Sequence, residues 1–342
     1  MKATDRRCVG DGRVHLTALG LGCSSLAGLY TATSEAEANA VLQATWDAGL
    51  RYFDTAPFYG YTLGERRVGS FLATRPRDEF VVSTKVGRVM QPDVGVAPGD
   101  DGWAEPLPFR PAYDYTRAGV LRSVEDSLQR MGLSRIDILF VHDIGRRTHG
   151  DRHDHYWRQL TRGGGLRALE ELRLEGRVAA IGLGVNEWQV ARDAMEETQI
   201  DCTLLAGRYT LLEQASSSTF MDDCVRHRSR VVIGGVFNSG ILAGHARFDY
   251  ADAPADVVAK VHALQSVCAE FGVALPAAAL QFPMAHPAVA ACVVGVRSAS
   301  ELHQDIAWFQ QAIPAALWNA LRDRGLLPAH APCPDDNDRT AG

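Results

Sequence analysis

Short apolar runs alternate with amphipathic stretches along most of this chain, and no other feature constrains the fold as strongly. The runs have the length and residue content of β-strands. Eight candidate strands end near Gly22, Phe53, Val86, Val141, Val185, Ala206, Gly235 and Val294. Strands that alternate with helices in one chain are typical of a parallel sheet.

The stretches between the runs have the apolar spacing of helices. They cover residues 34–48, 64–74, 116–131, 165–175, 187–197, 219–228, 255–271, 275–285 and 300–311. The first opens with Ser34 and Glu37, which have the spacing of a capping box. Near the N-terminus, the Gly-Asp-Gly segment 10–12 predicts a small hairpin over residues 8–15. We therefore predict an α/β fold, a single (β/α)8 TIM barrel with an N-terminal β-hairpin. An open, doubly wound sheet is the alternative.

The chain length fits one such barrel, since 342 residues exceed the roughly 250 that the fold needs. No linker divides the chain, so we assign residues 1–327 to the barrel. Residues 328–342 are rich in Pro, Asp and Ala and are expected to form a flexible tail. Two long connections, 88–115 and 144–164, follow the third and fourth strands. They therefore belong to the C-terminal face, where barrel active sites are built.

Composition excludes several classes of protein. A net charge of -6 argues against a nucleic-acid partner or an anionic membrane. No apolar run approaches the ~18 residues of a membrane span, and the first residues lack the apolar core of a signal peptide. The cysteines are odd in number and contain no Cys-x-x-Cys pair, which predicts reduced thiols in a cytoplasmic enzyme, with no zinc site. They are Cys8, Cys23, Cys202, Cys224, Cys268, Cys292 and Cys333.

Polar residues stand where four of the predicted strands end. Asp54, Lys85, His142 and Asn186 each follow an apolar run, and Tyr59 lies five residues beyond Asp54. In a barrel these ends are neighbours around one rim, so the side chains are expected to converge on one pocket. Only three of the 35 basic residues are lysines, and a lysine at a buried strand end requires a partner.

These residue types suit proton transfer. A free tyrosine has a pKa of about 10 and is a poor acid or base near neutrality. We expect the ammonium of Lys85 to lower the pKa of Tyr59, Asp54 to keep Lys85 charged, and His142 to hydrogen-bond a substrate oxygen. Two other interpretations stay open, a Schiff base on Lys85 and a metal site in the His- and Asp-rich segment 149–155.

The runs FDTAPFYGYTLGERRVG, VVSTKVGR and DILFVHDIG resemble the signatures of the aldo-keto reductase family, in the same order. The resemblance extends over essentially the whole chain. It implies a (β/α)8 barrel that binds a nicotinamide cofactor in extended form without a Rossmann domain. It also implies that the catalytic tetrad of the family falls on Asp54, Tyr59, Lys85 and His142.

The resemblance further implies a set of cofactor-binding residues. They are Gly22, Cys23, Asp54, Asn186, Gly235, Val236, Phe237, Asn238, Gly240, Gly295, Arg297, Ser298, Glu301 and Asp305. The chain departs from the family pattern at Val185, Ala206 and Gly234, where a serine, a glutamine and a stacking aromatic are usual. Because carboxylates near the adenosine ribose repel a 2′-phosphate, we expect NAD as the cofactor, with NADP as the alternative.

Two further runs, LLAGRYTLLEQ and VVIGGVFNSGILAG, resemble the branch of D-threo-aldose 1-dehydrogenases and L-fucose dehydrogenases, which includes a pyridoxal 4-dehydrogenase. This implies oxidation of an aldose of L-fucose or D-arabinose type at its anomeric carbon, giving a lactone. The alternatives are pyridoxal 4-dehydrogenase activity, general aldehyde or ketone reduction, and a cofactor-binding regulatory subunit. The expected partner is a small sugar or aldehyde, with neither nucleic acid nor membrane involved.

Overall fold

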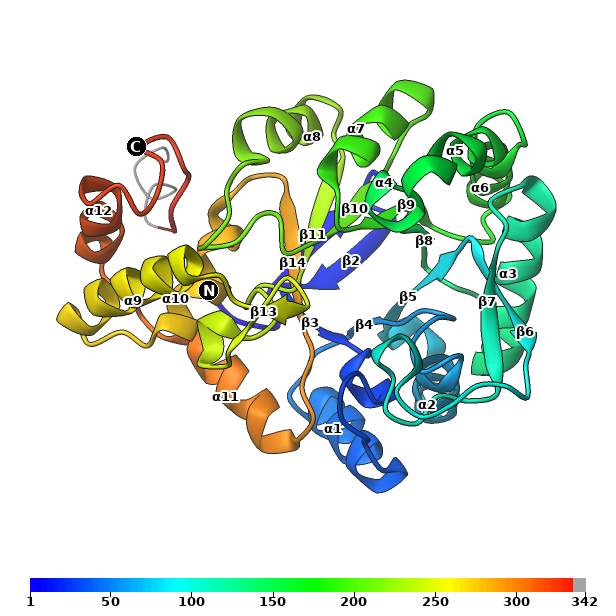
Figure 1. The fold of residues 1–342 in the computed structure, drawn as a ribbon, viewed down its shortest axis with the longest axis horizontal. Helices are drawn as coiled ribbons and strands as arrows, with labels where there is room; N and C mark the ends of the chain where they lie inside the picture. The colour runs from blue at the N-terminus through cyan, green and yellow to red at the C-terminus, as the bar shows by residue number, and fades with distance from the viewer. Residues whose placement is uncertain (335–342) are drawn as a thin grey trace.

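In the computed structural model, which describes residues 1–334, eight parallel strands close into a barrel (Figure 1). The strands are β3 (Leu19–Gly22), β4 (Tyr52–Asp54), β5 (Val81–Val86), β8 (Ile138–His142), β9 (Ala180–Val185), β10 (Cys202–Ala206), β11 (Arg230–Gly234) and β14 (Val289–Val294). β14 pairs with β3 through Val293 and Gly20, which closes the sheet. The predicted (β/α)8 barrel is confirmed, and the doubly wound alternative is wrong because an open sheet would leave two edges unpaired.

Helices surround the strands (Figure 1). They are α1 (Glu35–Asp47), α2 (Leu63–Leu72), α3 (Arg117–Met131), α6 (Gly165–Leu174), α7 (Trp188–Glu197), α8 (Asp222–Arg226), α9 (Ala255–Glu270), α10 (Leu275–Gln281), α11 (Ala299–Gln310) and α12 (Ala315–Asp323). The capping box predicted at α1 is present, since Ser34 and Glu37 each bind the backbone N–H of the other. Sequence reasoning missed α12, a short amphipathic helix that begins directly after Pro314.

The two long connections contain secondary structure of their own. The first forms the hairpin β6 (Arg88–Pro92) and β7 (Phe109–Tyr113), and the second contains α4 (Arg146–His149) and α5 (His153–Leu160). A further short hairpin, β12 (Arg247–Phe248) and β13 (Ala251–Asp252), follows β11. Single turns of 3-10 or π type are η1 (Ser25–Ala27), η2 (Arg77–Glu79), η3 (Asp100–Gly102), η4 (Gly150–Arg152), η5 (Ser217–Met221), η6 (Ile241–Ala243) and η7 (Phe282–Ala285).

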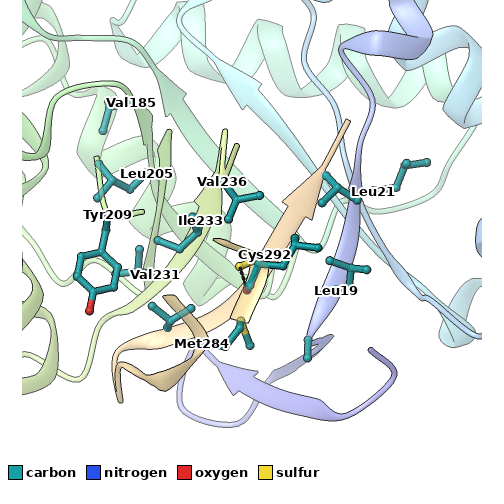
Figure 2. Packing of buried hydrophobic residues seen from close by; sticks show 14 of the residues in the cluster. Leu19, Leu21, Val185, Leu205, Tyr209, Val231, Ile233, Val236, Met284 and Cys292 are labelled. Atoms are coloured by element: carbon teal, nitrogen blue, oxygen red, sulfur yellow. Dashed lines mark hydrogen bonds between the residues drawn. The ribbon is translucent and has the colours of Figure 1, made fainter. Parts of the chain in front are cut away.

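Apolar packing fills the barrel from its N-terminal end. The predicted opening hairpin, β1 (Arg6–Val9) and β2 (Val14–Thr17), is present, and its Leu16 is buried with Tyr52, Phe140 and Val232 from the strands. Alternate side chains of the strands belong to a second, larger core cluster that includes helix residues such as Val41 and Leu302. Leu19 and Leu21 of β3 are part of this cluster (Figure 2). Because the interior is filled from below, the polar strand-end residues meet only at the C-terminal mouth.

The last described residues belong to the segment 328–342, which was expected to form a flexible tail. Residues 328–334 pack against the barrel, with Ala331 and Cys333 buried, whereas 335–342 lie outside the described residues.

Within residues 1–334 no single helix is long and apolar enough to cross a membrane. One bent pair, α9 with residues 275–285, reaches that length and composition jointly, with a 99° bend between its parts.

Candidate active site

Lys85 lies at the centre of the polar cluster at the barrel mouth. Its Nζ donates hydrogen bonds to Asp54 Oδ2 at 2.9 Å, to the Thr55 carbonyl at 2.9 Å and to Tyr59 Oη at 3.0 Å. Asp54 and Lys85 are both buried, each 2% exposed. A buried ammonium is tolerated only with such partners, so Lys85 is held in one place.

Neighbouring residues explain why the cluster forms. On β9, Gly184 makes room for the lysine, since a Cβ at that position would lie 3.1 Å from Lys85 Cε. Ser83 donates to Asp54 Oδ1 at 2.7 Å, so both carboxylate oxygens are engaged. Tyr59 is brought back over the mouth by the turn at Gly60, where φ is 57° and a Cβ would lie 2.5 Å from the Ala27 carbonyl. Gly60 is therefore a steric requirement of the site, and Gly184 leaves space for the lysine side chain.

His142, at the end of β8, faces Tyr59 across the mouth. The two ring centroids are 6.1 Å apart and the rings are nearly perpendicular. Burial, with the cations of Arg88 and Lys85 adding to it, lowers the pKa of His142 well below its usual value. The imidazole is therefore neutral at physiological pH and can donate one hydrogen bond into the site.

Burial decides the pKa of Tyr59, and here the sequence-based expectation is wrong. Loss of solvent raises the pKa of the phenol above its ordinary value; Lys85 opposes this rise and Asp54 adds to it. For Lys85, burial alone would lower the pKa, but Asp54 and Tyr59 outweigh it and raise the pKa. The ammonium therefore stays charged and limits the rise in the tyrosine pKa without reversing it.

Asp143 and its partner Arg88 lie beside His142, and neither was predicted from the sequence as a site residue. Asp143 accepts a hydrogen bond from Arg88 at 2.7 Å, and its Oδ2 lies 3.5 Å from His142 Nε2. Asn186, at the end of β9, donates to Asp143 Oδ1 at 3.3 Å. A signal was present in the sequence, because Asp143 directly follows the run that ends at His142. The sequence gives no comparable signal for Tyr250, which lies between β12 and β13 and whose Oη donates to Asn186 Oδ1 at 3.2 Å.

The histidine-rich segment supports His142 from behind. His149 is buried, and its Nε2 lies 2.9 Å from Tyr115 Oη, which in turn donates to the His142 carbonyl at 2.8 Å. Since the single Tyr115 proton is used on that carbonyl, His149 donates through Nε2. Among the described residues, no group of three His, Cys, Asp or Glu side chains is arranged to hold a metal ion.

The cofactor residues expected near β11 surround a small cleft. Asn186, Gly235 and Asn238 line it, together with Tyr250, whose Oη donates to Asn186 Oδ1 at 3.2 Å. Gly235 has φ of 59°, and a Cβ there would lie 3.3 Å from the backbone nitrogen of Gly207. The backbones of Gly207 and Gly235 lie close together, and side chains at these positions would fill the space beside them. This arrangement fits a cofactor that lies extended along the backbone.

Several of the expected cofactor residues have structural partners instead. Asn238 is buried between Thr210 and the Gly207 carbonyl, at 2.6 and 3.2 Å. Val236 lies in the apolar core (Figure 2), and Phe237 packs against Trp308. For the buried Val236 and Asn238, the backbone is what remains available to a ligand, whereas Phe237 is partly exposed. At the first strand, the Cys23 thiol is likewise buried, whereas Gly22 is partly exposed. Gly240, at φ 99°, begins the turn η6.

The expected adenosine end lies at the start of α11. Ser298 caps this helix by accepting from the Glu301 N–H at 3.2 Å, and Glu301 accepts from the Arg297 N–H at 2.8 Å. The Arg297 guanidinium donates to the Leu29 carbonyl at 2.6 Å. Asp305 is buried on the same helix. Gly295 precedes this segment with its Cα facing Ser25, where a Cβ would lie 2.8 Å from the hydroxyl oxygen.

Known proteins of one family match most of this chain. A model of the aldo/keto reductase family matches residues 18–323. A pyridoxal 4-dehydrogenase of Microbacterium luteolum is 49% identical over 340 residues, covering 96% of this chain and 99% of that protein. A D-threo-aldose 1-dehydrogenase of a Pseudomonas species is 39% identical over 322 residues, covering 92% and 95%.

A solved structure supports the fold. The holo form of an aldo-keto reductase from Bacillus halodurans superposes with a TM-score of 0.73 at 22% identity, covering 96% of this chain and 98% of that one. The long alignments and the family match agree with the (β/α)8 architecture built above. The chain therefore belongs to the aldo/keto reductase family and is an oxidoreductase.

Proposed function

We propose that this protein oxidises the anomeric carbon of an aldose, of L-fucose or D-arabinose configuration, to a lactone with NAD as the hydride acceptor. The contact of 3.0 Å between Lys85 Nζ and Tyr59 Oη, with His142 opposite, carries the proposal. It joins a proton acceptor to the cation that stabilises its charged form. Aldo-keto reductases use nicotinamide cofactors, and the choice of NAD is part of the proposal.

Each residue of the cluster has one role. Tyr59, as the tyrosinate, takes the proton of the anomeric hydroxyl while the C–H bond of that carbon breaks. The nicotinamide ring, when bound, accepts the hydride. Lys85 stabilises the tyrosinate, and Asp54 keeps Lys85 charged and oriented. Neutral His142 donates a hydrogen bond to the same substrate oxygen, which becomes the lactone carbonyl oxygen.

The charge at the start of α11 favours NAD. Arg297 is the one cation among the residues expected at the adenosine end, and its guanidinium is already bound to the Leu29 carbonyl. Glu301 supplies an exposed carboxylate there, and a carboxylate repels a 2′-phosphate but accepts a hydrogen bond from a ribose hydroxyl. The Asp305 carboxyl is buried on the same helix and does not face a ligand. Gly22, Asn186 and the glycine-rich segment 235–240 would hold the other end.

Pyridoxal is the second candidate substrate. The relative with 49% identity is named for it, whereas the relative named for an aldose has 39% identity. Pyridoxal carries a hydroxymethyl group beside its aldehyde and closes into a cyclic hemiacetal, so the same proton and hydride transfers apply. The rings of Phe58, Tyr59 and Trp103 pack together at the mouth at inclined angles, so an aromatic cluster borders the site.

A substrate and cofactor panel tests the proposal. L-Fucose, D-arabinose and pyridoxal are each incubated with NAD or NADP, and the product is identified as lactone or free acid by NMR. We expect lactone from a sugar and a kcat/KM at least tenfold higher with NAD. Oxidation of pyridoxal alone replaces the sugar by the second candidate. A higher kcat/KM with NADP overturns the cofactor assignment.

A further inference from the structure

The residue that follows His142 has an unusual backbone. Asp143 has φ of 42°, in the left-handed region that residues other than glycine rarely adopt. Its N–H still donates to the Gly184 carbonyl at 3.0 Å, so the backbone turns immediately after its last barrel contact. This turn directs the carboxylate back beside the imidazole of His142. Strain that is retained next to reacting groups motivates a functional hypothesis.

A buried cation fixes this carboxylate. Arg88 donates to Asp143 Oδ2, and its guanidinium lies 4.1 Å from the centroid of the Phe58 ring. The Arg88 side chain is only 6% exposed, whereas that of Asp143 is 15% exposed. The cation is thus enclosed and the anion faces the mouth. A buried arginine held in this way sets the position of its partner more tightly than a surface ion pair does.

The carboxylate has acceptor capacity that the protein does not use. An ionised carboxylate offers about four acceptor positions. Two hydrogen bonds reach it, from Arg88 at 2.7 Å and from Asn186 at 3.3 Å. His142 Nε2, at 3.5 Å, is beyond hydrogen-bond distance and is free to donate to a substrate. An acceptor is therefore open beside the donor that binds the reacting oxygen.

We propose that Asp143, positioned by Arg88, determines specificity by accepting a hydrogen bond from the hydroxyl on the carbon next to the reacting carbon. This inference rests on the proposed aldose oxidation. A substrate oxygen bound to His142 Nε2 brings the hydroxyl of the adjacent ring carbon within reach of a carboxylate 3.5 Å from the same nitrogen. Asp143 thus selects 2-hydroxy hemiacetals over their 2-deoxy counterparts.

The test compares two sugars that differ only in this hydroxyl. D-Arabinose and 2-deoxy-D-ribose, its 2-deoxy form, are oxidised by wild type and by Asp143→Asn, and the ratio of their kcat/KM values is measured. Comparing the ratio between proteins cancels the intrinsic reactivity of the sugars. We expect wild type to favour D-arabinose by roughly 10- to 100-fold, as for a hydrogen bond to a charged acceptor. In Asp143→Asn the ratio should fall at least fivefold.

Two further variants keep the test decisive. Asp154→Asn removes a carboxylate from the same connection, where it pairs with Arg146 in solvent, and should leave the ratio unchanged. If Asp143→Asn does not fold, the double variant Arg88→Met/Asp143→Asn removes both charges and should show the same loss. An unchanged ratio in a folded variant that oxidises D-arabinose overturns the inference alone. A wild type that oxidises neither these sugars nor L-fucose overturns the proposed function, and the inference falls with it.

Discussion

The two halves of the barrel mouth differ in what their polar side chains are bonded to. In the proposed catalytic half, Asp54, Tyr59, Lys85 and His142 contact one another or face one space. In the proposed cofactor half, made of Asn186 and the segments 235–240 and 295–305, several side chains bind the protein itself. The proposed catalytic half therefore depends on the chemistry of its side chains, whereas the proposed cofactor half depends on the shape of its backbone.

The largest expected effect tests the catalytic half. Tyr59→Phe removes the proton acceptor but keeps the ring, so kcat for oxidation should fall roughly 10²- to 10⁴-fold. NAD binding, followed by tryptophan fluorescence, should change little, because the ring contacts with Trp103 and His142 persist. Near-normal turnover with an unchanged pH profile would show that another group accepts the proton.

The pH dependence of oxidation tests the balance of charges in the same half. The active form of Tyr59 is the tyrosinate, and burial raises its pKa above the ordinary value. The ionised fraction, and with it kcat/KM, should therefore still be rising at pH 10. Lys85→Met removes the cation that opposes this rise, so at pH 8 activity should fall by more than tenfold. A wild-type plateau below pH 9 would contradict the assignment.

The same contrast explains how far the sequence predicts the site. Asp54, Lys85 and His142 are predictable because a charged or polar group at a buried strand end needs partners, and a barrel brings those ends together. Ser298 and Asn238 match family positions. The sequence alone does not show that Ser298 caps a helix or that Asn238 holds a loop together by hydrogen bonds, so it cannot distinguish these roles from contacts with a ligand. The raised pKa of Tyr59 depends on burial, which no local pattern reports.

The fold was predictable because its main elements also follow from local patterns in the sequence. The eight strand ends and the opening hairpin follow from apolar runs and turn residues, and the structure confirms them. The hairpin β6–β7 and the helices α4 and α5 were not predicted, because they pack as additions to the barrel. His149, for example, is buried against Tyr115, a contact that connects two separate loops.

A buried carboxyl group of the cofactor half gives the next prediction. Burial, with Glu301 adding to it, raises the pKa of Asp305 from 3.8 to about 7. Above pH 4 the unfolded chain loses this proton more readily than the folded one. Folding is therefore penalised increasingly up to about pH 7, by at most about 4 kcal/mol. Asp305→Asn removes the penalty, so its gain in Tm over wild type should be larger at pH 8 than at pH 4.

A matched control makes this measurement specific. Asp323→Asn changes an exposed carboxylate of α12 in the same way and should give a similar, small change in Tm at both pH values. An Asp305→Asn variant whose gain in Tm is equal at pH 4 and pH 8 would show that Asp305 is ionised at little cost in the folded protein.

The smallest expected effect decides whether Ser298 belongs to the cofactor half at all. Its hydroxyl caps α11 through the Glu301 N–H, as the Thr116 hydroxyl caps α3 through the Gly119 N–H. Loss of an N-cap lowers the free energy of unfolding by about 1 kcal/mol, so Ser298→Ala and Thr116→Ala should both do so in urea titrations. Because α3 lies away from the proposed cofactor residues, Thr116→Ala shows what the loss of a cap does to stability without a direct effect on NAD binding. It also removes the hydrogen bond that Thr116 Oγ1 donates to Asp114 Oδ1 at 2.6 Å. Equal NAD dissociation constants for the two variants make Ser298 a structural residue, whereas weaker binding only in Ser298→Ala returns its side chain to the cofactor site.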